Sequence, residues 1–336
     1  PLLQRWFVET GHPSAKDPYF LYAASNAGSL LALLSYPLAI EPWLSVSRQS
    51  RTWGWGFLIC AGFIALCAVT LGLRSQPSPS ASSDEKGIGS AVSWKRRWRW
   101  IAWAFIPSSL LLGVTTYIST DVAPIPLLWV VPLAVYLLTF ILVFSETPRI
   151  IERYVAEGFI QVFFSPASRQ RARAAVADGI LHKAFVLVMP VAILVLLVMI
   201  YSGLGPEKIY NIFLWHLVIF FIVAMVCHGE LARTRPPTRY LTQFYLLMSV
   251  GGLLGGIFNA FVAPLVFDRI AEYLFAMVVA CLVLPPLGGG EKKTQWTRAL
   301  DVGLPAVMAL LAVGLIARRW AGSYSELVKL NQLREE

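Results

Sequence analysis

The residues best suited to chemistry are a cysteine, a histidine and a glutamate within four consecutive positions, Cys227-His228-Gly229-Glu230. Thiolate, imidazole and carboxylate groups are the ligands that zinc prefers. Neighbouring residues on one chain rarely turn toward one ion, however, and no second cluster complements these, so we predict no metal site. We expect a polar knot at a membrane interface, in which His228, Glu230 and Arg233 hold the following loop. A membrane enzyme that acts on lipid headgroups through Cys227, His228 and Glu230 is an alternative.

A second group of polar side chains lies in or beside long apolar runs: Asn26, Thr116, Asp121, His216 and Asn259. These residues could line a small polar cavity. Alternatively, they serve the fold as helix caps and as hydrogen-bonding groups between helices, because an unpaired amide in hydrocarbon is costly. His216 is expected to be a packing histidine, with ligation of a haem or chlorophyll-type metal as the alternative. No cofactor is predicted otherwise, and no set of residues specifies a catalytic site.

The elements that must position these residues are long apolar segments. Hydrophobic residues make up 57% of the 336 residues and charged residues 14%, against about 25% charged in a soluble domain. Nine stretches almost free of charge are candidate membrane spans: 19–40, 53–73, 100–120, 124–144, 184–201, 209–227, 243–267, 273–284 and 302–317. A charge at the bilayer centre costs at least ~2.5 kcal/mol. We therefore predict an all-α polytopic transmembrane helical bundle of about nine spans, of which the last two are short.

The distribution of charge divides the chain into six parts. These are two spans at 1–74, a disordered basic linker at 75–99, spans three and four at 100–144, a cytoplasmic amphipathic and basic segment at 145–183, spans five to nine at 184–317, and a polar tail at 318–336. Apolar residues recur at helical spacing from Ile150 to Phe163, which predicts an amphipathic helix lying in the membrane interface. Docking of that face on a partner protein is the alternative.

The basic residues predict the orientation. If all nine spans cross the membrane, the segments on the side of the N-terminus contain 20 of the 28 Lys and Arg residues. Basic residues collect on the cytoplasmic side and contact anionic headgroups. We therefore expect a multi-pass protein of a bacterial inner membrane with a cytoplasmic N-terminal side, lipid as a partner, and no binding of nucleic acid. The run Lys95-Arg96-Arg97 is expected to be an ordinary flank of a span, with a contact to lipid phosphate as the alternative.

Two spans carry small residues at intervals of four. They are Ala24, Gly28 and Ala32 in the first span, and Gly251, Gly252, Gly255 and Gly256 in the seventh. Small side chains let a second helix approach closely. We predict that both sets are helix-packing faces inside the bundle.

Several of these stretches, taken in order, carry a resemblance to a known family. They are Asp17–Asn26, Pro107–Asp121 with Pro126–Trp129, Cys227–Arg233, and the Gly251–Gly256 run with Asn259. Together they resemble the membrane part of bacterial fused transporter-like/spermidine-synthase-like proteins, over most of residues 1–286. The resemblance implies an integral membrane module. The nucleoside loop and the acidic residues of the family's aminopropyltransferase domain have no matching positions here, so that enzymatic activity is not carried over.

Two functions follow as hypotheses. The first is a non-catalytic membrane subunit or scaffold that packs with other membrane subunits in a larger bacterial complex, for example a respiratory or photosynthetic one. It is motivated by the charge-free spans and the small-residue faces. The alternative is a transporter-like protein for a small, cationic metabolite such as a polyamine, in which Pro37, Pro107 and Pro190 would interrupt helices to form a site.

Overall fold

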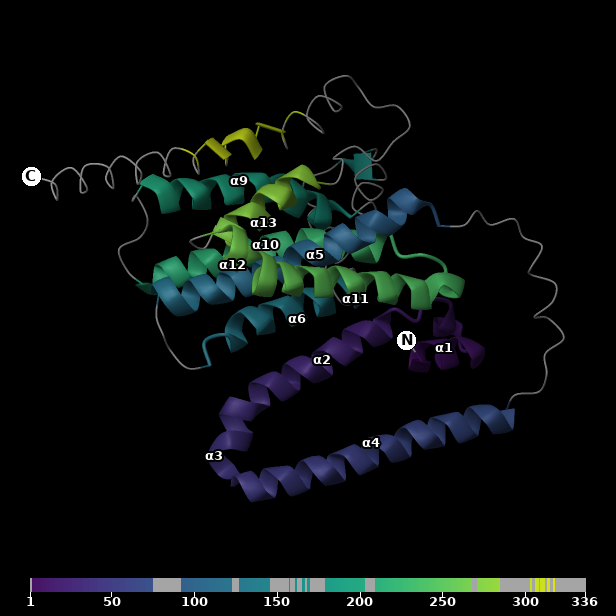
Figure 1. Ribbon diagram of the computed structural model, residues 1–336. Helices are drawn as coiled ribbons and strands as arrows, with labels where there is room; N and C mark the ends of the chain where they lie inside the picture. Colours follow the sequence, from purple (N-terminus) through teal and green to yellow (C-terminus); the bar gives the residue numbers. More distant parts are fainter. Residues whose placement is uncertain are drawn as a thin grey trace, which may run out of the picture.

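The computed structural model describes residues 2–74, 92–122, 127–145, 179–202, 209–267 and 271–284, together with single positions in 157–169 and 303–317. Every regular element in this part is a helix (Figure 1). The longer helices are α2 (Phe20–Ser35), α4 (Val46–Arg74), α5 (Trp94–Tyr117), α6 (Val130–Phe144), α9 (Ile180–Ser202), α10 (Ile209–Arg233), α11 (Leu241–Ile257) and α13 (Ala271–Leu282). The short helices α1 (Leu2–Glu9), α3 (Glu41–Trp43) and α12 (Ala263–Val266) flank them. The all-α prediction is confirmed.

Six helical segments are long and apolar enough to cross a membrane. They are Phe20–Trp43, Val46–Leu73, Trp94–Thr120, Leu181–Ile200, Tyr210–Arg233 and Thr238–Val266. Two further apolar helices, α6 and α13, are shorter. The first eight predicted spans therefore correspond to helices, but two of them fall below the length of a full crossing. The ninth, at 302–317, lies mostly outside the described residues.

Prolines do not interrupt the membrane helices. Pro107 lies inside α5 and Pro190 inside α9, and both helices continue past them. At Pro37 the chain adopts a π-helical turn, Tyr36–Ile40, and α2 passes through it into α3. Neighbouring helices and local changes of helical geometry satisfy the backbone groups that a proline frees in a membrane. The helix interruptions that the transport alternative expected at Pro107 and Pro190 are therefore not present.

The core of the bundle forms around α5. This helix packs most closely on α11, and also on α10 and α13, while α10 packs on α9 and α6, and α2 packs on α6. The largest side chains that are fully buried come from α5 and its neighbours, such as Trp100, Trp103, Phe220 and Phe244. Because α5 is enclosed on several sides, its residues fix the positions of the surrounding helices.

The helix α4 stands apart from this core. It forms the 28-residue apolar segment Val46–Leu73, and none of the residues in that segment is buried. In Figure 1 it runs at the margin of the molecule beyond α2, and no described helix packs extensively on it. Apart from Gln49 and Leu71, which are partly covered, the side chains of this segment are exposed and can contact lipid or another protein.

Several predicted segments lie outside the described residues. These are residues 75–91 of the linker, the tail at 318–336, and most of 145–183, including the predicted interfacial helix apart from Glu157 and Gln161. The linker is shorter than predicted, because α5 begins at Trp94. Ser93 caps this helix, with its hydroxyl accepting a hydrogen bond from the amide of Arg96 at 3.4 Å.

Candidate functional site at the polar end of the bundle

Polar side chains from four separate segments meet at one end of the bundle. The guanidinium of Arg96, in the first turns of α5, donates from Nε to the carbonyl of Thr234 at 3.2 Å and also reaches the carbonyl of Arg235. One turn further on, the indole of Trp100 donates to the Thr234 hydroxyl at 3.1 Å. A cation at the C-terminus of a helix is favoured by the helix dipole. The start of α5 thus satisfies the carbonyls that follow the end of α10.

The N-terminal segment docks on the same loop. Arg235 is paired with Asp17, and its guanidinium lies over the ring of Tyr19, 5.2 Å from the centroid. The hydroxyl of Tyr19 donates to the carbonyl of Pro236 at 2.8 Å, and burial raises the pKa of this phenol to about 12. Gln4 on α1 donates to the hydroxyl of Tyr245 at 2.9 Å. These contacts hold α1 and the start of α2 against the α10–α11 connection.

We call this region the polar end; it comprises Asp17, Arg96, His182, Glu230 and Arg235. Glu230 is its buried acid. Its Oε1 lies 2.8 Å from Nε2 of His182 on α9, and its Oε2 lies 3.9 Å from Arg99 on α5. The imidazole of His182 rests against the backbone of Gly229, where a Cβ atom would come within 2.5 Å of Nδ1. Glycine is therefore required at position 229 for α9 to deliver a histidine to Glu230.

These contacts place the N-terminal segment, the start of α5, the start of α9 and the end of α10 at one end of the molecule. If consecutive spans cross the membrane in opposite directions, these same segments lie on one side of it. No pattern in the sequence predicts a partner for Asp17, Arg96, Arg99 or His182. Their only signal was that each flanks an apolar run on the same predicted side.

The predicted knot of His228, Glu230 and Arg233 does not form. The hydroxyl of Thr139 donates to the carbonyl of Tyr136 at 2.8 Å, so His228 donates from Nδ1 to the Thr139 oxygen at 2.9 Å. The imidazole is stacked on Phe140, with 3.6 Å between ring centroids, and is fully buried against α6. His228 and Glu230 thus turn to different helices, and Arg233 lies beside the backbone of Gly179 instead.

The separation of His228 from Glu230 also argues against a metal site or a catalytic site formed by Cys227, His228 and Glu230. Cys227 and His228 are both fully buried, and within the described part of the chain no three His, Cys, Asp or Glu residues are grouped as metal ligands would be. A lipid headgroup cannot reach an imidazole that lies inside the α6–α10 interface. The alternative of lipid chemistry by Cys227, His228 and Glu230 is therefore not supported by this geometry.

The predicted cavity residues are dispersed over the bundle. The amide of Asn259, in the π-helical turn Phe258–Val262 that follows α11, donates to the hydroxyl of Ser109 on α5 at 2.8 Å and to the carbonyl of Gly255 at 2.9 Å. Asn26 donates to the carbonyl of Tyr22, one turn back on α2, at 2.8 Å. Thr116 is exposed on α5. The side chain of Asp121 lies outside the described residues.

His216 is a packing histidine. Its Nδ1 lies 2.9 Å from the hydroxyl of Tyr273 on α13, and the ring of Tyr117 on α5 covers it at 4.3 Å between centroids. Only 2% of its surface is exposed. Since one nitrogen is bonded to a phenol and a ring covers one face, the geometry favours packing over ligation of a haem or chlorophyll-type metal.

The glycines of α11 differ by face. A Cβ atom on Gly251 would clash with the carbonyl oxygen of Ile101 and come within 2.8 Å of the Ala104 Cβ. One turn later, a Cβ on Gly255 would lie 2.8 Å from the carbonyl oxygen of Phe105 and 2.9 Å from the amide nitrogen of Ser109. These two glycines are the helix-packing face, and they let α11 touch the backbone of α5.

In the described part of the chain, the other predicted small residues do not form close helix-packing contacts through their Cβ positions, although the carbonyl of Gly252 accepts a hydrogen bond from the Ser108 hydroxyl on α5 at 2.9 Å. A Cβ on Gly252, Gly256 or Gly28 would meet no atom within 4 Å. Ala24 and Ala32 are exposed on the same helix as Gly28. The internal packing face of α2 is instead the one that carries Ala23, which is buried.

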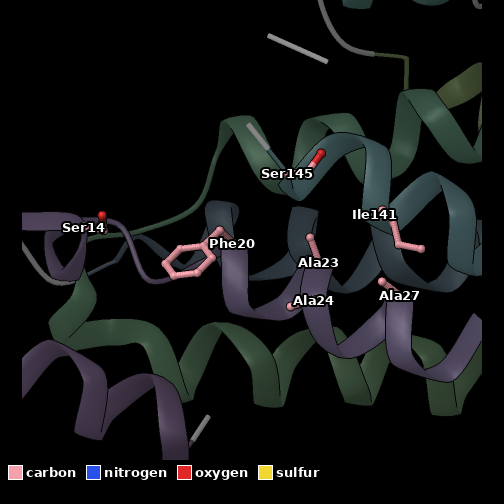
Figure 2. A pocket seen from close by; sticks show the side chains of 7 residues that line it. All are labelled: Ser14, Phe20, Ala23, Ala24, Ala27, Ile141 and Ser145. Atoms are coloured by element: carbon pink, nitrogen blue, oxygen red, sulfur yellow. The ribbon is translucent and has the colours of Figure 1, made fainter. Parts of the chain in front are cut away.

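One described pocket lies between α2 and α6, with a volume of about 430 Å³. Its lining residues are Ser14, Phe20, Ala23, Ala24, Ala27, Ile141 and Ser145 (Figure 2). No charged side chain is among them. The only polar side-chain groups of the lining are two serine hydroxyls, and no base that could activate them is among the lining residues.

Comparisons with known proteins add no relative to this picture. No protein family model, no curated protein and no solved structure matches the chain.

Proposed function

We propose that this protein is a non-catalytic integral membrane subunit that packs, through α4, on another protein of a larger bacterial membrane complex. The observation that carries the proposal is the separation of α4 from the bundle. A helix of membrane length with no buried residue contributes nothing to the core of its own chain. The dispersal of the polar residues over separate interfaces further favours a structural role over transport.

The sequence of α4 fits a protein partner. Ala61, Ala65, Ala68 and Gly72 follow one another at intervals of three or four residues, so they share one helix face. Helices in lipid associate through close van der Waals packing, for which small residues are suited. Ile59 and Phe63 lie on the opposite face, where bulky side chains suit contact with lipid.

Photo-crosslinking in the native membrane tests this proposal. A photoreactive amino acid at Ala61 or Ala65 should give a protein adduct that contains a second, different polypeptide. The same group at Ile59 or Phe63, or at exposed Leu187 on α9, should give lipid adducts alone. If Ala61 and Ala65 give only lipid adducts or only adducts with another copy of this chain, the proposal is wrong.

We further infer that residues 302–317 form a ninth span and that the N-terminal side faces the cytoplasm, in a bacterial inner membrane. The excess of basic residues on that side supports this orientation. Single cysteines at Ser14 and at Ser323, in a background with the native cysteines removed, would be labelled from outside the membrane with an impermeant thiol reagent. Only the Ser323 position should react in intact cells. Labelling of neither position would remove the ninth span, and labelling of Ser14 would reverse the orientation.

A further inference from the structure

The first two turns of α5 divide their basic residues between two directions. This segment, residues 94–100, reads Trp-Lys-Arg-Arg-Trp-Arg-Trp. Arg96 and Trp100 turn inward, to the carbonyl and hydroxyl groups of Thr234. Arg96 is thus committed to the fold, and it is unavailable to an external ligand.

Lys95 and Arg97 remain for such a ligand. Lys95 is exposed, and Arg97 is partly exposed. The Nε group of Arg97 is buried and has no hydrogen-bond partner in the described part of the chain, so this atom is not itself open to a ligand. No acid in the described part of the chain pairs with either residue. The two acids of the polar end, Asp17 and Glu230, are already paired with Arg235 and His182.

Two tryptophans lie on the helix face between Lys95 and Arg97. Trp94 and Trp98 are spaced four residues apart and share one face of α5, and Lys95 and Arg97 lie on either side of that face. Their rings meet edge to face at 5.5 Å, yet 67% of Trp94 and 51% of Trp98 are exposed. Exposed indoles beside a membrane helix favour the headgroup level, where an apolar ring meets polar groups.

The guanidinium fork of arginine matches the oxygens of a phosphate. A phosphate in lipid is held at the level of the headgroups, which is where the tryptophans would place Arg97. We propose that Lys95 and Arg97, which project to the two sides of the helix face that carries Trp94 and Trp98, each contact a phosphate of an anionic phospholipid in the leaflet at the polar end of the bundle. A free anion would gain nothing from the two exposed indoles, whereas a lipid at the headgroup level contacts the indoles and the basic residues together.

Native mass spectrometry of the detergent-solubilised full chain tests the site. Phosphatidylglycerol and phosphatidylcholine would be titrated against the wild type and against K95Q/R97Q. A basic residue near anionic lipid contributes roughly a fivefold preference, so K95Q/R97Q should lose the preference for phosphatidylglycerol by about 25-fold. The matched control is R48Q/R51Q, which removes two exposed arginines near the start of α4, away from the polar end. This control should keep the preference.

Two further measurements make the outcome decisive. Protection of the buried Cys227 and Cys281 from a thiol reagent shows that K95Q/R97Q is folded. If that variant unfolds, R97K and W94A/W98A take its place: R97K should keep most of the preference, and W94A/W98A should weaken it. The proposal is overturned if K95Q/R97Q and R48Q/R51Q lose equal preference, if neither loses any, or if inorganic phosphate displaces the lipid at equal concentration.

Discussion

Replacement of Gly251 or Gly255 by alanine should force α11 away from α5. The atoms that a new Cβ would meet at these positions are mainly backbone atoms, namely the carbonyl oxygens of Ile101 and Phe105 and the amide of Ser109. Backbone atoms cannot rotate out of the way as a side chain can, so the two helices must separate. Overpacking of this kind costs about 1–3 kcal/mol.

The matched controls are Gly252→Ala and Gly256→Ala. Both positions lie on the same helix, and a Cβ there would meet no atom within 4 Å. The gain in helix propensity from glycine to alanine is common to all four variants, so it cancels when test and control are compared. The difference in the free energy of unfolding between Gly251→Ala and Gly252→Ala should therefore be the cost of packing alone.

Thiol labelling can measure this difference. Cys227 and Cys281 are buried, whereas Cys60 and Cys67 on α4 are exposed and would be replaced by serine first. A change of 1.4 kcal/mol is about tenfold in an equilibrium constant, so Gly251→Ala and Gly255→Ala should label about 5- to 150-fold faster than their controls when opening is at equilibrium. Equal labelling of Gly251→Ala and Gly252→Ala would refute the assigned packing face.

Three further predictions concern the hydrogen-bonded contacts. Gly229→Ala should displace His182 from Glu230 and reduce the free energy of unfolding by about 1–3 kcal/mol. In a double-mutant cycle, adding His182→Ala to Gly229→Ala should cause little further loss of stability. Additive losses would contradict the contact. Ser109→Ala and Asn259→Ala should show a coupling energy of about 0.6 kcal/mol, the average for hydrogen bonds between membrane helices, whereas a coupling of zero would mean that this bond contributes nothing. The pKa of Tyr19 is about 12 in the folded protein against 10.0 for a free phenol, so its stabilising effect is complete below pH 10 and is lost as the pH rises toward 12. The midpoint of thermal unfolding, measured between pH 9 and 11, should fall less in Tyr19→Phe than in the wild type.

The failed prediction at His228 and Glu230 has a simple origin. The apolar run ends at Cys227, and this pattern predicts the end of the helix there, with the polar residues in a loop. The helix continues to Arg233. Two side chains that are two positions apart on a helix point about 200° away from each other. His228 therefore contacts α6, while Glu230 contacts α9. A correct helix end would have excluded the knot from the sequence alone.

For the glycines of α11, by contrast, the sequence alone does not show which pair contacts another helix. Gly251/Gly255 and Gly252/Gly256 have the same residue type and the same spacing. Nothing in the local pattern tells which pair faces a neighbour. Only the position of α5 decides, because its backbone lies against the first pair and leaves the second pair open.

Hydrophobicity and charge determined the helical character of this protein, its apolar helices of membrane length, and the common side of the flanks that carry Arg96, Arg99 and Arg235, which the described structure brings together at one end. The physical reason is local: each apolar residue avoids water and each charge avoids hydrocarbon, whatever its neighbours are. The pairs Arg96–Thr234, His182–Glu230 and Asn259–Ser109 join residues that are 138, 48 and 150 positions apart. Such pairs depend on how the helices rotate and cross, and that is decided by the packing of side chains from the whole bundle.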